Sequence, residues 1–155
     1  MMTKQLLAIL LLLPLSVSAG EVDGKAIICL EKYGYAWEAN SPATGNLYVG
    51  WMFRNGYAIS QELSARPSKG SEMAISSPSR SRGYYTASPF FIEWDDTYRL
   101  DRQTLTLVAN YPWTDKPKVT QCEVFSSIAE YQLAFDGIRR KENEALKAFV
   151  GKNKI

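Results

Sequence analysis

The stretch FFIEWDDTYRLDRQTLTL, at residues 90–107, contains the clearest strand pairing in the sequence. Apolar side chains alternate with others in residues 90–94 and again in 98–100, with the period of two that is typical of a β-strand. A polar four-residue loop follows, so we expect Leu100 to face Leu105 across an antiparallel hairpin. A slip by one residue would move every apolar side chain to the other face, so the pattern itself predicts the register.

A second hairpin is predicted around Asn55-Gly56, the dipeptide that most strongly indicates a two-residue turn. Strands are expected on both sides of it, at residues 47–53 and 57–63. Both faces of residues 47–53 are apolar, so each face needs a cover, and only one of them can point into a single core. The register that follows from the turn pairs Met52 with Ile59 and Tyr48 with Leu63.

The rest of the chain up to residue 126 also reads as strands and loops. Further strands are expected at residues 26–31, 35–38, 84–87 and 118–125. Residues 64–83 are rich in serine, proline, glycine and arginine, which predicts a solvated connection with one short edge strand, or else a basic loop that engages an anionic surface. We therefore predict a mainly β fold, an antiparallel meander of about six to eight strands forming a barrel or half-barrel, with a two-layer sandwich as the alternative.

From Ser127 onward the apolar spacing changes to three and four residues, which is helical. Ser127 and Glu130 form a capping box at the start, and Gly151 is a typical stop. We expect one C-terminal helix over residues 127–150, packed on the strands in its first half and freer beyond Arg139. A disordered tail is expected at residues 151–155.

Residues 1–19 have the composition of a secretory signal peptide, which is removed from the mature protein. Lys4 gives a basic start, residues 6–15 form an apolar run, and small residues precede Gly20. A run of about ten residues is too short to cross a bilayer about 30 Å thick as a helix. We expect an exported protein, periplasmic or extracellular, with no transmembrane segment and one β-domain over residues 20–126.

Two cysteines, Cys29 and Cys122, lie in predicted strands near the two ends of this domain. In an exported protein such a pair predicts a disulfide, and a meander that closes on itself would make the two strands neighbours. Two buried free thiols are the alternative. Two thiolates without histidine lack the usual tetrahedral ligand set, so a metal site is not expected.

Few residue types with catalytic chemistry are available. The chain has no histidine, which removes the commonest general base and metal ligand, and its net charge is only +2 with both signs scattered. Neither a cofactor nor a nucleic-acid partner is therefore expected. Glu93, Asp95 and Asp96 form the one dense acidic group, which predicts a turn; a carboxylate-dependent hydrolase acting on glycans and a calcium site are the alternatives.

Aromatic residues are the other conspicuous feature, with 4 tryptophans, 9 tyrosines and 6 phenylalanines. Most aromatics fill the core of a small β-domain, but some can line a cavity or an exposed surface. We predict an exported, monomeric, non-enzymatic binding or interaction protein for an apolar or carbohydrate ligand or an envelope protein. A structural envelope or virion component is a further alternative. The candidate ligand or partner surface comprises Tyr48, Trp51, Met52, Tyr84, Tyr85 and Trp94.

Overall fold

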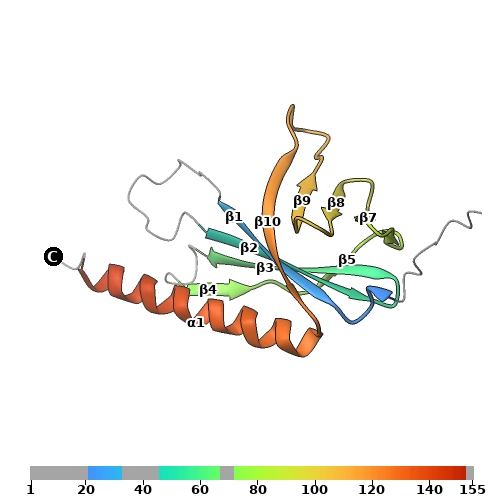
Figure 1. Ribbon diagram of the computed structural model, residues 1–155. Coiled ribbons are helices and arrows are strands. Elements are labelled where there is room, and N and C mark those ends of the chain that lie inside the picture. Colours follow the sequence, from blue (N-terminus) through green and yellow to red (C-terminus); the bar gives the residue numbers. More distant parts are fainter. Residues whose placement is uncertain (1–20, 33–45, 67–71, 153–155) are drawn as a thin grey trace, which may run out of the picture.

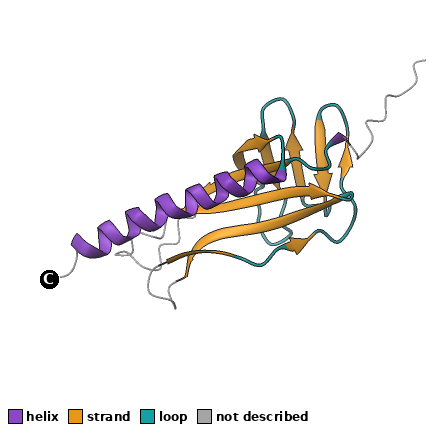
Figure 2. Ribbon diagram, turned by 90° about the horizontal axis from the view of Figure 1, so that it is seen from below, coloured by secondary structure: helices purple, strands orange, loops and turns teal. Residues whose placement is uncertain are grey.

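The structure is a computed structural model that describes residues 21–32, 46–66 and 72–152 (Figure 1). Within these ranges the strands form one antiparallel sheet of 10 strands, in the order β4-β3-β2-β1-β10-β9-β8-β7-β6, with β5 also pairing β3. The sheet curls into a half-barrel, and one helix lies along its outer face (Figure 2). The elements are β1 (Ala26–Lys32), β2 (Asn46–Arg54), β3 (Tyr57–Arg66), β4 (Glu72–Ile75), β5 (Ser79–Arg80), β6 (Thr86–Ala87), β7 (Phe91–Trp94), β8 (Tyr98–Asp101), β9 (Thr106–Ala109), β10 (Lys118–Phe125) and α1 (Ile128–Lys152).

This architecture confirms the predicted antiparallel half-barrel with a C-terminal helix. Two of the strands, β5 and β6, have only two residues each, and they add to the number expected from the alternation. The short edge strand expected in the serine-rich connection is β4. The expected signal peptide at residues 1–19 and the strand at 35–38 lie outside the described residues.

The β2–β3 hairpin has the predicted turn and the predicted register. Asn55 and Gly56 adopt φ angles of 53° and 78°, the left-handed values that a two-residue turn between twisted strands requires. Across the hairpin the pairs are Met52 with Ile59 and Tyr48 with Leu63, as the sequence predicts.

The β8–β9 hairpin is formed, but its predicted register is wrong by two residues. Leu100 pairs with Leu107 and not with Leu105. The Asp101 carboxylate accepts the backbone N–H groups of Gln103 and Thr104, each at 2.9 Å, and Leu105 takes a φ of 55°, so the loop extends through Leu105. Because side chains alternate with a period of two, this shift leaves the residues that remain in the two strands on their predicted faces.

The half-barrel has a hydrophobic core on each face of the sheet. The inner core lies on the concave face and contains Trp51 and Phe53 of β2 with Trp94 of β7. The outer core lies between the sheet and α1 and contains Met52 of β2 with Tyr131 and Phe135 of the helix. Both apolar faces of β2 are therefore covered, one by the curled sheet and the other by α1.

The helix begins at the predicted cap. The Ser127 hydroxyl accepts the N–H of Glu130 at 3.1 Å, while the Glu130 carboxylate reaches back to the N–H and hydroxyl of Ser126. Glu130 thus bonds one residue further back than in the usual capping box. At its other end α1 continues through Gly151 to Lys152, so the predicted stop at Gly151 is wrong, while residues 153–155 lie outside the described part.

Two hydrogen bonds attach the second half of α1 to the sheet. The Tyr48 hydroxyl donates to Glu142 Oε1 at 2.8 Å, and the N–H of Met73 donates to Asn143 Oδ1 at 2.7 Å. Burial, together with the Glu142 carboxylate, raises the pKa of Tyr48 to about 12. The Met73 bond gives a partner to a backbone N–H of β4, the strand at one edge of the sheet.

The predicted disulfide is confirmed. Cys29 of β1 and Cys122 of β10 are directly opposite each other on neighbouring strands and are bonded, with their Cα atoms 4.1 Å apart. Disulfides of this kind are typical of proteins that fold outside the reducing cytosol. In the described part of the chain, no helix has the length and apolar character needed to span a membrane.

Gly50 in the middle of β2 allows α1 to pack closely on the sheet. A Cβ atom at this position would lie 2.1 Å from the Tyr131 hydroxyl oxygen, far inside any permitted contact. We expect Gly50→Ala to lower the free energy of unfolding by about 1–3 kcal/mol, because the buried Tyr131 ring must shift. Urea unfolding measures this, with Gly83→Ala as the control because a Cβ there meets nothing within 4 Å. Equal losses in both variants would contradict the steric explanation.

Candidate functional site

Seven aromatic rings form a continuous chain of contacts along the concave face, here called the aromatic chain. Neighbouring ring centroids are 4.7 to 6.0 Å apart, within the range of favourable aromatic pairs. The chain begins at the buried Tyr85 and ends at Trp113, which is 77% exposed. In order along the concave face its members are Tyr85, Phe53, Trp94, Trp51, Tyr98, Tyr111 and Trp113.

Strand alternation and one tight turn position the middle of this chain. Trp51 and Phe53 are two residues apart on β2, so both face inward. Trp94 and Tyr98 are paired across the β7–β8 hairpin, where Asp95 and Asp96 form the turn with φ angles of 56° and 53°. This pairing stacks the Tyr98 ring on Trp94 at 5.3 Å, and the curl of the sheet brings both against Trp51 of β2.

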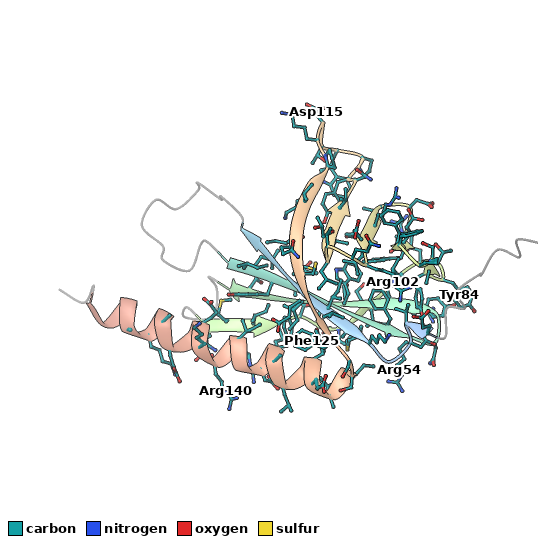
Figure 3. All side chains as sticks on the ribbon, in the orientation of Figure 1. Arg54, Tyr84, Arg102, Asp115, Phe125 and Arg140 are labelled. Atoms are coloured by element: carbon teal, nitrogen blue, oxygen red, sulfur yellow. A yellow bond between two sulfur atoms is a disulfide. The ribbon has the colours of Figure 1, made fainter. Side chains whose placement is uncertain are left out.

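The exposed end of the chain lies on the long loop between β9 and β10. The Trp113 ring stacks on Tyr111 with centroids 5.1 Å apart and an angle of 22° between planes. Figure 3 shows Asp115 at the tip of this projecting hairpin, on the opposite side of the sheet from α1. An exposed tryptophan held in a fixed stack offers a large apolar surface with little conformational entropy left to lose.

Residues of the aromatic chain line two cavities, and Tyr98 lines both. The smaller, the inner cavity, has a volume of about 70 Å³. The larger, the turn cleft, has a volume of about 400 Å³ and surrounds the β7–β8 turn. The inner cavity is lined by Glu31, Leu47, Val49, Trp51, Ser60, Glu62, Tyr98 and Tyr111. The turn cleft is lined by Tyr84, Thr86, Glu93, Trp94, Asp95, Asp96, Thr97, Tyr98, Arg99 and Asn110.

Each cavity is lined by a tryptophan whose indole N–H group lacks a hydrogen-bond partner among the described residues. The indole N–H groups of Trp51, at the inner cavity, and Trp94, at the turn cleft, are buried and have no hydrogen-bond partner in the described part of the chain. Trp51 is only 6% exposed and Trp94 only 2%. Leaving a buried donor unsatisfied costs about 1–3 kcal/mol, so each such group in a native structure calls for an explanation.

The inner cavity also contains charged and polar groups. Glu31 is buried and forms an ion pair with Lys118 across β1 and β10. Burial raises the pKa of Tyr98, and its hydrogen bond with Tyr111 adds to this, so the Tyr98 hydroxyl stays protonated near neutral pH. Donors and acceptors thus line the same small space beside the Trp51 ring.

Two of the three carboxylates that line the turn cleft, those of Asp95 and Glu93, are bonded to other groups of the protein. Asp95 Oδ1 accepts the N–H groups of Arg82 and Gly83, and Glu93 forms a cross-strand ion pair with Arg99 at 3.6 Å. The positive φ angles at Asp95 and Asp96 agree with the predicted turn. Among the described residues no cluster of three or more acidic, cysteine or histidine side chains could hold a metal ion, which gives the calcium hypothesis no support.

The six residues of the predicted surface do not form one surface. Tyr48 and Met52 lie beneath α1 in the outer core, whereas Trp51, Tyr85 and Trp94 belong to the aromatic chain on the concave face. The sixth, Tyr84, is 68% exposed and lines the turn cleft together with Trp94. A site that includes Tyr48 or Met52 would require the helix to move.

Sequence reasoning did not identify Tyr98, Tyr111 or Trp113 as site residues. Tyr98 continues the alternation that places Trp94 inward, so its face was readable from the pattern. Tyr111 and Trp113 lie in an irregular loop, where no periodic signal indicates which way a side chain points.

Comparisons with known proteins provide no relative for this chain. No protein-family model matches it, and no curated protein or solved structure matches it either.

Proposed function

We propose that this chain is an exported, non-enzymatic binding protein that holds a small ligand against the aromatic chain on its concave face. One observation carries the proposal: the two buried indole N–H groups of Trp51 and Trp94 lack partners, and each residue lines a cavity. Both indole nitrogens are closed to solvent, so a ligand acceptor reaches either of them only when the ring turns on binding. Sites lined by aromatic side chains with a few polar groups are typical of small-molecule binding.

The proposal that the protein is exported rests on two features, the sequence of residues 1–19 and the disulfide. Residues 1–19 have the composition of a signal peptide, and a disulfide such as Cys29–Cys122 is typical of proteins in oxidising compartments. We propose the periplasm or the medium as the location.

Binding without catalysis agrees with the bonds of the carboxylates. Glycoside hydrolysis needs an acid and a second carboxylate flanking the same bond. In the turn cleft Asp95 and Glu93 are engaged by backbone N–H groups and by Arg99, which leaves Asp96 as the one carboxylate there without a partner among the described residues. Glu62 and Glu31 both line the inner cavity, where Glu31 is paired with Lys118.

Replacing Trp94, which lines the turn cleft, by Phe tests the proposal, because it removes an indole N–H and keeps an aromatic ring. We expect ligand affinity to fall about three- to tenfold, the effect of losing one hydrogen bond. Isothermal titration of the exported form, residues 20–155, measures this with a panel of neutral, amino and uronic tetrasaccharides and with the apolar probe anilinonaphthalene sulfonate.

Tyr48→Phe is the matched control, because its hydroxyl bonds Glu142 beneath α1 on the other face of the sheet. Its ligand affinity should equal that of the unmodified protein. Binding of no member of the panel would contradict the proposal. Hydrolysis of a glycan that is lost in Glu93→Gln would replace it with the hydrolase hypothesis.

A further inference from the structure

Tyr84 at the turn cleft is an aromatic ring that is both fixed and exposed. It is 68% exposed, yet its ring packs on Tyr57 with centroids 4.5 Å apart. Gly56, with its φ of 78°, permits this contact, because a Cβ there would lie 2.8 Å from the Tyr84 ring. Arg80 covers the Tyr57 ring at 4.2 Å. The Tyr84 ring is therefore already held in place, so little of its conformational freedom is left to lose when a ligand binds.

The turn cleft is lined by hydrogen-bond donors and acceptors that can pair with the hydroxyl groups of a ligand. Asn110 offers an amide that both donates and accepts, and Asp96 offers a carboxylate. Arg99 also belongs to the lining, but its guanidinium is paired with Glu93 and lies over the Phe91 ring at 3.6 Å. Thr86 and Thr97 belong to the same lining, and the Thr97 hydroxyl donates to the Asp95 carbonyl at 3.0 Å. A ligand hydroxyl both donates and accepts, so a hydroxyl-rich ligand is complementary to this mixed lining, whereas a purely apolar one would bury it without partners.

The size and charge of the turn cleft restrict the class of ligand that it can bind. Its volume of about 400 Å³ lies within the range of about 300–1,000 Å³ that is usual for small-ligand sites. Three carboxylates and one guanidinium line it, so an anionic ligand would meet repulsion.

We propose that the turn cleft binds a saccharide, with one sugar ring on Tyr84 and its hydroxyls bonded by the polar lining, and that it takes neutral or amino sugars in preference to uronic acids. This rests on the proposed function and names its ligand class and subsite. The alternating apolar and hydroxyl-bearing surfaces of a sugar ring match an aromatic face beside mixed donors and acceptors.

The test is titration of residues 20–155 with tetrasaccharides of glucosamine, glucose and galacturonic acid. Tyr84→Ala should weaken glucosamine or glucose tetramer binding about five- to tenfold, the effect of losing one aromatic contact, while Tyr84→Phe should stay within about twofold. Phe90→Ala is the matched control, because Phe90 is 57% exposed but is not in the cleft lining. Thermal unfolding confirms that the variants are folded, which the exposure of both side chains leads us to expect.

Each outcome bears on the proposal. Binding of the anilinonaphthalene probe without any saccharide, or saccharide binding weakened by Trp94→Phe but not by Tyr84→Ala, overturns the inference and leaves the proposed function standing. A galacturonate tetramer that binds more tightly than the glucose tetramer overturns the charge preference. Failure of every ligand overturns both. Saccharide binding that depends on Tyr84 supports both.

Discussion

Replacing Cys29 and Cys122 together by alanine is expected to lower the free energy of unfolding by about 4–5 kcal/mol. The two cysteines are separated by 93 positions, so the bridge removes much of the freedom of the unfolded chain. That loop contains most of the sheet, from β2 to β9. Loss of this size is comparable to the whole stability of many small domains, so the variant is expected to unfold at moderate temperature.

Urea unfolding of the oxidised protein and of the double alanine variant measures the difference. Thiol labelling of the unfolded, unreduced protein provides a separate check, and we expect no label to be incorporated. Because the bridge acts mainly on the unfolded state, the native fold of the variant should be retained under stabilising conditions. Equal midpoints for the two proteins, with equal denaturant dependence, would contradict the prediction.

The strands of this fold were predictable where local chemistry decides the structure. Asn55 and Gly56 can both adopt positive φ at low cost, and that property fixes the turn and hence the pairing of β2 with β3. The helix start at Ser127 is equally local, because the cap bonds join residues a few positions apart.

The register of β8 and β9 was not predictable from alternation alone. A shift of two residues preserves every face, so the apolar pattern cannot distinguish a pairing of Leu100 with Leu105 from one with Leu107. What decides is the bonding of the Asp101 carboxylate to two backbone N–H groups and the positive φ of Leu105. Leucine rarely adopts that φ, so composition gives no warning of it.

The candidate site depends on contacts between residues far apart in sequence. Trp51 meets Trp94 and Tyr98 only because the sheet curls until β8 approaches β2. Alternation indicates that these side chains face inward, but it does not give the curvature that brings them together. For α1 as well, local patterns do not reveal contacts between distant residues. The apolar spacing predicts a helix packed on the sheet, but it does not show that the helix covers Tyr48 and Met52.

The packing of the second half of α1 could not be predicted from apolar spacing alone. Apolar residues become sparse beyond Arg139, which predicts weak packing there, yet Glu142 and Asn143 each bond the sheet. We therefore place the end of the docked part of the helix at these two residues.

Replacing Phe135 by alanine is expected to lower the free energy of unfolding by about 3–5 kcal/mol, the usual loss for truncating a buried phenylalanine. Phe135 is 2% exposed in the outer core and stacks on Tyr131, with ring centroids 5.3 Å apart. The cavity left behind lies between a helix and a sheet that must keep their spacing, because Tyr131 is seated over Gly50. Collapse to fill it is therefore limited.

Leu133→Ala is the matched control, because Leu133 lies on the same helix but is 74% exposed, and its loss should stay below about 0.5 kcal/mol. Urea unfolding compares the two variants with the unmodified protein. Similar midpoints for Phe135→Ala and Leu133→Ala would mean that α1 does not dock in solution. Tyr48 and Met52 would then be open on the outer face, and the site would have to be sought on both sides of β2.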